Sequence, residues 1–269
     1  MIAAGVGVVG LLLAGATTWS GPRPEPMNGL LVCALDVGQG DSILIDPPGG
    51  DPILVDTGPP GSGVAQLLSD RGVERLSALV LTHDQSDHVG EAPSLLRSLR
   101  VGKLVHSGVG AEIRRLAVWV GTEPVRMFQG ANLPAAGGVR VVALWPPPSA
   151  QAASGDENES SLVLLVRWRH FTALLGADAE AEAVPVDPGP VDLLKVSHHG
   201  SRDAGLDNLL ERTMPKLALI SVGAGNPYGH PAGATLGSLS RHSVRTLRTD
   251  EDGSVGARVE EDGWSAVAC

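Results

Sequence analysis

The segment that decides the fold spans residues 82–88 and reads Thr82-His83-Asp84-Gln85-Ser86-Asp87-His88. It follows an apolar run at 76–81 whose composition predicts a β-strand. A tight loop after a strand can direct His83, Asp87 and His88 at a single ion. Imidazole and carboxylate ligands together suit Zn²⁺, Mn²⁺ or Fe²⁺ far better than Ca²⁺. The segment therefore predicts a metal site at the end of a strand.

Polar residues of the same kind follow other predicted strands. Asp178 ends a second apolar strand, where its carboxylate could bridge two metal ions. His198 and His199 end a third strand, and His230 follows a fourth. Adjacent histidines cannot both point the same way from an extended chain. One member of the pair is therefore expected to bind metal, while the other orients it or contacts substrate.

The placement of the histidines favours a metal site over a set of unrelated structural residues. Five of the eight lie at strand ends: His83, His88, His198, His199 and His230. A lone histidine is more often structural, but five of them with two well-placed aspartates favour metal binding. The others, His106, His170 and His242, lack this context and are expected to be structural or surface residues.

Composition indicates strands and turns rather than a helical bundle. The 269 residues include 35 glycines and 20 prolines, and 43% are hydrophobic while only 3% are aromatic. The net charge is −10 and the longest basic run is Arg114-Arg115, which argues against a general nucleic-acid-binding surface. A nuclease is not excluded, because metal ions in an acidic cleft carry positive charge that neutralises a phosphodiester locally.

Hydrophobic periodicity predicts a mixed α/β chain. Strands are expected at residues 30–35, 42–46, 52–56, 76–82, 103–106, 139–145, 162–168, 171–175, 191–196, 217–222, 244–247 and 255–259. Helices are expected at 63–71, 89–99, 206–212 and 233–240. Residues 107–138 show no clear pattern, and 151–159 are expected to form a polar loop. Cys33 and Cys269 are expected to be one core and one terminal thiol, with a single disulfide as the alternative.

The N-terminal region differs from the rest of the chain. Residues 2–19 are apolar, and eighteen residues lie at the lower limit for a bilayer span. No Lys or Arg precedes them, unlike the basic start of a secretory signal. The Pro-rich stretch 21–26 is typical of a stiff linker. We expect residues 1–28 to be a membrane-associated helix, or its remnant, plus linker. The alternatives are a Gly/Ala-rich buried helix or a disordered leader. Residues 29–269 are expected to form the globular domain.

These motifs resemble the metallo-β-lactamase superfamily, whose signature is His-x-His-x-Asp-His, then a later Asp and a later His. More closely, the chain resembles the soluble C-terminal domain of ComEC/Rec2-type DNA-internalisation competence proteins. The matching segments are 35–42, 55–58, 81–90, 194–201, 220–223, 228–231 and 248–253. In that family a polytopic membrane region precedes this domain, which agrees with the apolar segment 2–19.

The resemblance implies a four-layer αββα sandwich that holds one or two divalent ions, Zn²⁺ or Mn²⁺, at one edge. It implies hydrolysis of phosphodiesters, with degradation of one DNA strand during uptake. The implied location is the cell membrane, with the hydrolase domain (29–269) on its extracytoplasmic side and a membrane channel protein as a possible partner through residues 2–19. The implied ligands are His83, Asp87, His88, Asp178 and one of His198 or His199. Asp36, Asp41 and Asp56 are expected to bind the ring nitrogens that face away from the metal and so to fix the histidine tautomers.

Two departures from the family pattern affect the first metal position. Gln85 stands where the superfamily has its second histidine, and a neutral amide is a weak metal ligand. The superfamily's middle histidine has no counterpart in 154–161, where Asp156 or Asn158 is expected to stand in. This position is therefore expected to bind weakly, to prefer Mn²⁺, or to stay empty. The position that includes Asp87 and His88 looks intact.

The expected reaction is metal-assisted hydrolysis, in which the ion lowers the pKa of its bound water from about 15.7 to about 7. Asp87 would orient or deprotonate that water. His230, or the non-ligating histidine of the pair, would contact the phosphate or protonate the leaving oxygen. Lys195, Ser201 and Arg202 are expected to bind the backbone of a single-stranded DNA substrate, although the two cations are equally consistent with solvated surface charges.

Two rival functions stay open. The substrate could be a small phosphodiester or a phosphorylcholine ester, since the chain has few aromatic platforms on which bases could stack. Alternatively, the degenerate first position could mark a non-catalytic module that binds DNA or a membrane partner.

Overall fold

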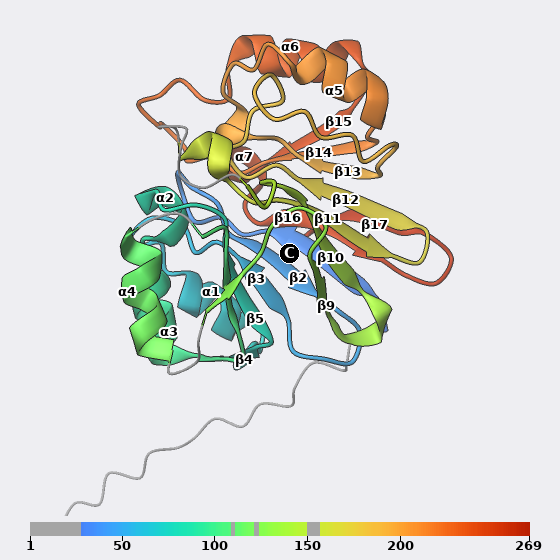
Figure 1. Cartoon of the computed structure of the whole chain (residues 1–269). Coiled ribbons are helices and arrows are strands. Elements are labelled where there is room, and N and C mark those ends of the chain that lie inside the picture. Colours follow the sequence, from blue (N-terminus) through green and yellow to red (C-terminus); the bar gives the residue numbers. More distant parts are fainter. Residues whose placement is uncertain (1–27, 109–110, 121–123, 150–156) are drawn as a thin grey trace, which may run out of the picture.

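The computed structural model describes residues 28–108, 111–120, 124–149 and 157–269. Over these ranges the strands form two large sheets that pack face to face, with helices on both outer surfaces (Figure 1). The predicted four-layer αββα sandwich is therefore confirmed.

The first sheet comes from the N-terminal half and the two last strands. Its strands are β1 (Leu30–Ala34), β2 (Ile43–Asp46), β3 (Ile53–Val55), β5 (Ala78–Leu81), β7 (Leu104–His106), β8 (Val125–Arg126), β16 (Val255–Val259) and β17 (Trp264–Ala268). They lie in the order β17-β16-β1-β2-β3-β5-β7-β8. The helices of this half are α1 (Val64–Asp70), α2 (Ser86–Val89), α3 (Ala92–Ser98) and α4 (Ala111–Val120). A separate pair joins β4 (Arg75–Leu76) to β6 (Arg100–Val101).

The second sheet follows in the C-terminal half. Its strands are β9 (Asn132–Pro134), β10 (Arg140–Trp145), β11 (Val163–Trp168), β12 (Phe171–Leu175), β13 (Leu193–Lys195), β14 (Leu217–Ile220) and β15 (Arg245–Arg248), in the order β15-β14-β13-β12-β11-β10-β9. The helices of this half are α5 (Leu206–Thr213), α6 (Gly233–Arg241) and α7 (Thr249–Asp252). Short 3₁₀ turns are η1 (Ala136–Gly138), η2 (Asn158–Ser160) and η3 (His198–Gly200).

Three apolar clusters hold the layers together. Leu30 and Val32 of β1 point into the cluster between the two sheets. Because side chains alternate along a strand, Leu31 and Cys33 point to the other face and pack beneath α1, α3 and α4. A third cluster lies beneath α5 and α6. Burial on both faces explains why β1 appears in the sequence as a continuous apolar run.

Parallel strands place their carboxyl ends at one edge of the sandwich. β3, β5 and β7 run parallel in the first sheet, and β12, β13 and β14 run parallel in the second. The loops after β3, β5, β12 and β13 carry Asp56, His83, Asp178 and His199. Both sheets therefore contribute side chains to the same edge.

The two cysteines form a disulfide, so the expectation of two separate thiols is wrong. Cys269 follows β17, which pairs with β16, and β16 pairs with β1, the strand of Cys33. The bridge thus fastens the C-terminus to the first strand. Strand β17 was not predicted, because its partly exposed side chains give no apolar run. Helix α4 lies in the region where the sequence shows no clear pattern.

None of the helices in the described ranges is long and apolar enough to cross a bilayer. The apolar segment 2–19, predicted to be a membrane helix, and the linker 21–26 lie outside the described residues.

Candidate metal centre

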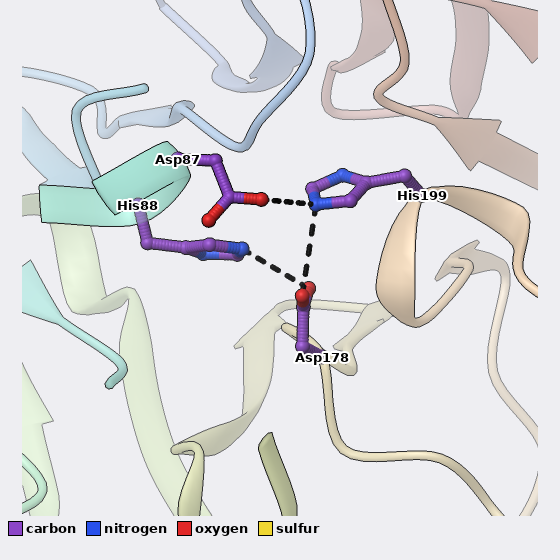
Figure 2. Close-up of side chains that lie close together, drawn as sticks. All are labelled: Asp87, His88, Asp178 and His199. Carbon is purple, nitrogen blue, oxygen red and sulfur yellow. Dashed lines mark hydrogen bonds and ion pairs between the residues drawn. The ribbon is translucent and has the colours of Figure 1, made fainter. Parts of the chain in front are cut away.

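Four side chains from both sheets converge at the shared edge: Asp87, His88, Asp178 and His199. Each offers one ligand atom, and these atoms all lie within 4.8 Å of one another (Figure 2). His88 Nε2 is 3.1 Å from Asp178 Oδ1. His199 Nε2 is 3.2 Å from Asp87 Oδ2 and 3.6 Å from Asp178 Oδ2. The structure therefore brings together one aspartate and one histidine of the 82–88 loop, the later aspartate, and the second histidine of the pair.

The atoms of this cluster fit a divalent cation better than they fit one another. His88 Nε2 and both carboxylate oxygens of Asp178 are buried without a hydrogen-bond partner of acceptable geometry. Leaving a buried charge unsatisfied is costly. Bonds of about 2.0–2.2 Å to a tetrahedral ion separate neighbouring ligand atoms by roughly 3.3–3.6 Å. The three contacts of 3.1, 3.2 and 3.6 Å given above lie close to this value, so a cation would supply the missing partner.

In their neutral form, both histidines of the cluster would present an unprotonated Nε2 to a metal ion. His88 Nδ1 lies 2.7 Å from Asp56 Oδ2, and His199 Nδ1 lies 3.0 Å from the carbonyl oxygen of Ser221. Because a carboxylate and a carbonyl accept hydrogen bonds, Nδ1 carries the proton in each neutral ring and Nε2 keeps its lone pair. The predicted role of Asp56 as a tautomer-fixing partner agrees with this contact.

The carboxylates of the cluster strongly favour a bound positive charge. Burial alone would lower the pKa of His88, but the carboxylates of Asp178 and Asp56 raise it well above its usual range. For His199, burial lowers the pKa and Asp178 opposes it, and hydrogen bonds to Asp41 and Asp87 help to raise the value to about 9. Without a cation, the negative charge of these carboxylates keeps the two histidines protonated. A metal ion would take the place of those protons.

A close approach of two loops holds Asp87 in place. Asp41 N donates to the backbone oxygen of Asp87 at 3.2 Å. Gly40 has a φ of +150°, and a Cβ built there would lie only 2.2 Å from that same oxygen. Ser221 Oγ donates to Gly40 O at 2.7 Å. This bond fastens the loop to the residue that follows β14, whose carbonyl oxygen also contacts His199 Nδ1. These contacts explain why a glycine is needed before Asp41.

Lys195 is buried, so the prediction that it contacts DNA is wrong. Its side chain is 1% exposed, and Nζ forms an ion pair with Asp41 and donates to Ala177 O at 3.1 Å. Asp41 Oδ1 in turn lies 3.4 Å from His199 Nδ1, where the sequence predicts a histidine partner. The position of Lys195 within an apolar strand was the signal for burial, because its neighbours in β13 are also buried.

The first metal position is incomplete. His83 Nε2 is buried without a hydrogen-bond partner, 4.0 Å from Asp178 Oδ2. Burial, with the nearby His88, lowers the pKa of His83 to about 3, so its ring is neutral. Gln85 Nε2 donates to Asn158 Oδ1, so these two amides bind each other. Asp156, the other proposed substitute for the middle histidine, lies outside the described residues. The His88 ring lies 4.1 Å from the His83 ring, but His88 Nε2 is directed at Asp178 Oδ1. Among the described residues, this position therefore offers His83 and one oxygen of Asp178.

His198 belongs to a separate group beside the cluster. Its Nδ1 lies 2.9 Å from Glu180 Oε1, and Ser201 Oγ donates to the same oxygen at 2.6 Å. Its Nε2 is 4.0 Å from Asp178 Oδ2. Ser201 is buried with its proton engaged, which corrects the prediction that it binds substrate. Sequence reasoning missed Glu180, although it lies two residues after Asp178.

Backbone geometry separates the two adjacent histidines. His198 and His199 have φ values of 48° and 52°, in the left-handed region that residues other than glycine rarely adopt. Such strain is typical of functional sites. The turn allows His199 to enter the cluster while His198 faces Glu180, so the two side chains point in different directions, as expected. The role of the second histidine in orienting its neighbour or contacting substrate stays a prediction.

The remaining predicted residues lie farther out. The Asp36 carboxylate is exposed and accepts the Gly38 N–H at 3.3 Å, so its prediction as a histidine partner is wrong. Arg202 is exposed and forms no hydrogen bond or ion pair with any residue that the structure describes. His230 packs against His198, with 5.6 Å between ring centroids, and its Nδ1 has no partner within the described part of the chain. The roles assigned to Arg202 and His230 stay predictions.

Known proteins resemble this chain in sequence and in fold. The family described as the metallo-beta-lactamase superfamily matches residues 35–224. ComE operon protein 3 of Bacillus subtilis is 33% identical over 82% of this chain and 32% of its own length. Recombination protein 2 of Haemophilus influenzae is 30% identical over 86% of this chain and 29% of its own length. The metallo-beta-lactamase fold protein YhfI of Bacillus subtilis superposes with a TM-score of 0.59, covering 81% of this chain and 96% of YhfI at 14% identity.

The chain therefore belongs to the metallo-β-lactamase superfamily, and the predicted resemblance is confirmed. It is similar to competence proteins and spans about a third of the length of the curated relatives that it matches. Membership and cluster together define a metal-dependent hydrolase fold with a His/Asp site suited to a divalent ion.

Proposed function

We propose that this chain is a one-metal phosphodiester hydrolase that cleaves single-stranded DNA during DNA uptake. The observation that carries the metal chemistry is the set of buried ligand atoms on His88 and Asp178 that have no hydrogen bond of acceptable geometry. The DNA substrate is supported by similarity to proteins named for competence and recombination. Exposed Arg202, next to the histidine turn, supplies a cation for the DNA backbone.

The metal ion and the side chains around it would have different tasks in hydrolysis. Zn²⁺ or Mn²⁺, when bound, would acidify water and polarise a phosphoryl oxygen. Asp87 Oδ2 faces His199, and its side chain is 28% exposed, so Asp87 can orient the attacking water and hold its proton. Asp178 and His88 hold the centre, and Asp56 keeps the His88 lone pair directed at it. His230, whose ring lies 5.6 Å from that of His198, would donate a proton to the leaving oxygen.

A single ion follows from the unequal completeness of the two positions. Asp87, His88, Asp178 and His199 supply four ligand atoms. The first position offers His83 and a share of Asp178, while Gln85 and Asn158 bond to each other. Zinc in proteins takes at least three protein ligands. The first position therefore stays empty at ordinary metal concentrations.

The proposed location is the extracytoplasmic side of the cell membrane. Disulfides persist in oxidising compartments, and the chain joins Cys33 to Cys269. The apolar segment 2–19 would attach the domain to the membrane or to a membrane channel protein. Trapping of free thiols in whole cells tests this location, since a reduced pair in the native protein would contradict it.

The test of the activity uses the full chain loaded with Mn²⁺ or Zn²⁺ and an end-labelled single-stranded oligonucleotide. We expect cleavage by the native chain and none by Asp178→Asn, with one ion per native chain by elemental analysis. Hydrolysis of bis-p-nitrophenyl phosphate with DNA untouched would replace the nuclease by a small-molecule phosphodiesterase. No bound metal and no activity after addition of Mn²⁺ would instead indicate a non-catalytic module.

A further inference from the structure

Beside the metal centre, the chain displays its one tyrosine to solvent. Tyr228 is 68% exposed, the most exposed large hydrophobic residue in the described part of the chain. Its ring lies 5.9 Å from the ring of His230, at an interplanar angle of 32°. His230 in turn contacts His198, whose Nε2 is 4.0 Å from Asp178 Oδ2. A row of ring contacts therefore leads from the surface to the edge of the metal centre.

The loop that carries Tyr228 is held by one side chain. Asn226 Oδ1 accepts hydrogen bonds from Tyr228 N at 3.2 Å and His230 N at 3.1 Å. Asn226 Nδ2 donates to His230 O at 2.6 Å and to Gly223 O at 3.0 Å. The Tyr228 backbone is therefore fixed before any ligand arrives. A ring on a pre-ordered loop binds a partner with little further loss of conformational entropy.

Electrostatic attraction between this site and the phosphates of a nucleic-acid strand is weak. The chain carries a net charge of −10, and Lys195, one of the two cations expected to bind the backbone, is buried. Backbone affinity depends on the number of phosphates that cations neutralise. Another contact is needed to hold a strand with its phosphate at the metal centre, and stacking of bases on an aromatic ring supplies such a contact without sequence preference.

We propose that Tyr228 stacks against the base next to the scissile phosphate and so makes the site selective for nucleic acid over small phosphodiesters. This inference rests on the proposed function. The composition suggests few stacking platforms, but the single tyrosine stands where one is required. His230 forms the inner side of the platform, between the stacked base and His198.

Steady-state kinetics of the metal-loaded full chain test the proposal with two strands, oligothymidine and a strand of the same length that lacks bases. Stacking of one base is worth about 5- to 150-fold in affinity. We expect Tyr228→Ala to raise KM for oligothymidine by about this factor with kcat little changed, and to leave KM for the abasic strand unchanged. Tyr228→Phe keeps the ring and is expected to retain the native KM.

Met214→Ala is the matched control. Met214 is 62% exposed and lies just before β14, at the strand end opposite the metal centre, so its loss removes exposed apolar surface without touching the site. Equal KM values of the native chain and Tyr228→Ala for oligothymidine would overturn the inference while leaving the nuclease proposal intact. An equal rise of KM in the control would also overturn it.

A second measurement does not depend on cleavage. Because the chain has one tyrosine, labelling with 3-fluorotyrosine gives a single ¹⁹F resonance. We expect it to shift on addition of an uncleavable methylphosphonate oligothymidine to the metal-loaded chain, and to stay in place with an abasic strand of the same backbone. If no DNA is hydrolysed with any metal, the proposed function fails. A resonance that does not move with oligothymidine overturns the stacking role by itself.

Discussion

The Asp87–His88 half of the 82–88 loop and its His83–Gln85 half leave the same strand end but meet different partners. His88 has Asp56 behind it, and Asp87 faces His199, so both side chains join a complete ligand set. His83 is equally buried, but Gln85 is engaged by the Asn158 amide. Proximity to a metal loop is therefore not sufficient for binding. A position also needs enough ionisable or lone-pair ligands, each oriented from behind.

The largest expected effect comes from the residue that touches both halves. Asp178 lies 3.1 Å from His88 Nε2 and 4.0 Å from His83 Nε2. Asp178→Asn removes a ligand charge and should weaken metal binding by more than the 10–100-fold typical of outer partners. Calorimetric titration with Zn²⁺ and Mn²⁺ measures this. Native affinity in the variant would place the ion elsewhere.

Restoring histidines to the His83–Gln85 half tests whether missing ligands are what prevents it from binding a metal ion. Gln85→His combined with Asn158→His replaces the bonded amide pair by two imidazoles beside His83. We expect the metal content to rise from one to two ions per chain, because the position then has three histidines and a share of Asp178. Each single substitution serves as a control and should leave one ion. Two tightly bound ions in the native chain would refute the difference between the halves.

The support behind the stronger half can be tested with two aspartates that both seemed, from the sequence, to be histidine partners. Asp56 binds His88 Nδ1, whereas Asp36 is exposed and binds the Gly38 N–H. Asp56→Asn should lower metal affinity about 10–100-fold, the usual cost of losing such a partner. Asp36→Asn is the control and should leave affinity unchanged. Equal losses in both variants would mean that Asp56 acts only on overall stability.

The smallest expected effect concerns the backbone behind Asp87. Gly40→Ala places a Cβ 2.2 Å from the Asp87 carbonyl oxygen, so the loop must shift away. We expect metal affinity to fall several-fold and the free energy of unfolding to fall by about 1–3 kcal/mol. Gly38→Ala controls for backbone strain, since Gly38 also has a positive φ but no atom within 4 Å of a built Cβ. Chemical denaturation and metal titration of both variants separate crowding from strain.

Much of the fold could be predicted from periodicity and turn residues. The apolar runs of β1, β5 and β12 gave both the two-sided burial and the strand ends where ligands gather. The resemblance of the motifs gave the layer order. Strand β17 and helix α4 were missed, because a partly exposed strand and a region without clear periodicity leave no strong pattern.

Some residues of the candidate site could likewise be predicted from the sequence, and others could not. Local spacing identified Asp87, His88 and Asp178 as ligand candidates, since each follows an apolar strand. It gave no indication of Glu180, which acts only through its contacts with His198 and Ser201. It also suggested that Lys195 was a surface cation, because the buried partner, Asp41, is distant in the sequence.

The amino-acid sequence by itself determined the residue types of the site, their order at strand ends, and the loss of two histidines at one position. These properties are local, since they depend on side-chain chemistry and on the alternation of a strand. Only the tertiary structure decided that His199 rather than His198 joins the cluster, that Gln85 bonds to Asn158, and that Cys33 pairs with Cys269. Each of these is a choice of partner between residues far apart in the chain, and the packing of the two sheets fixes that choice.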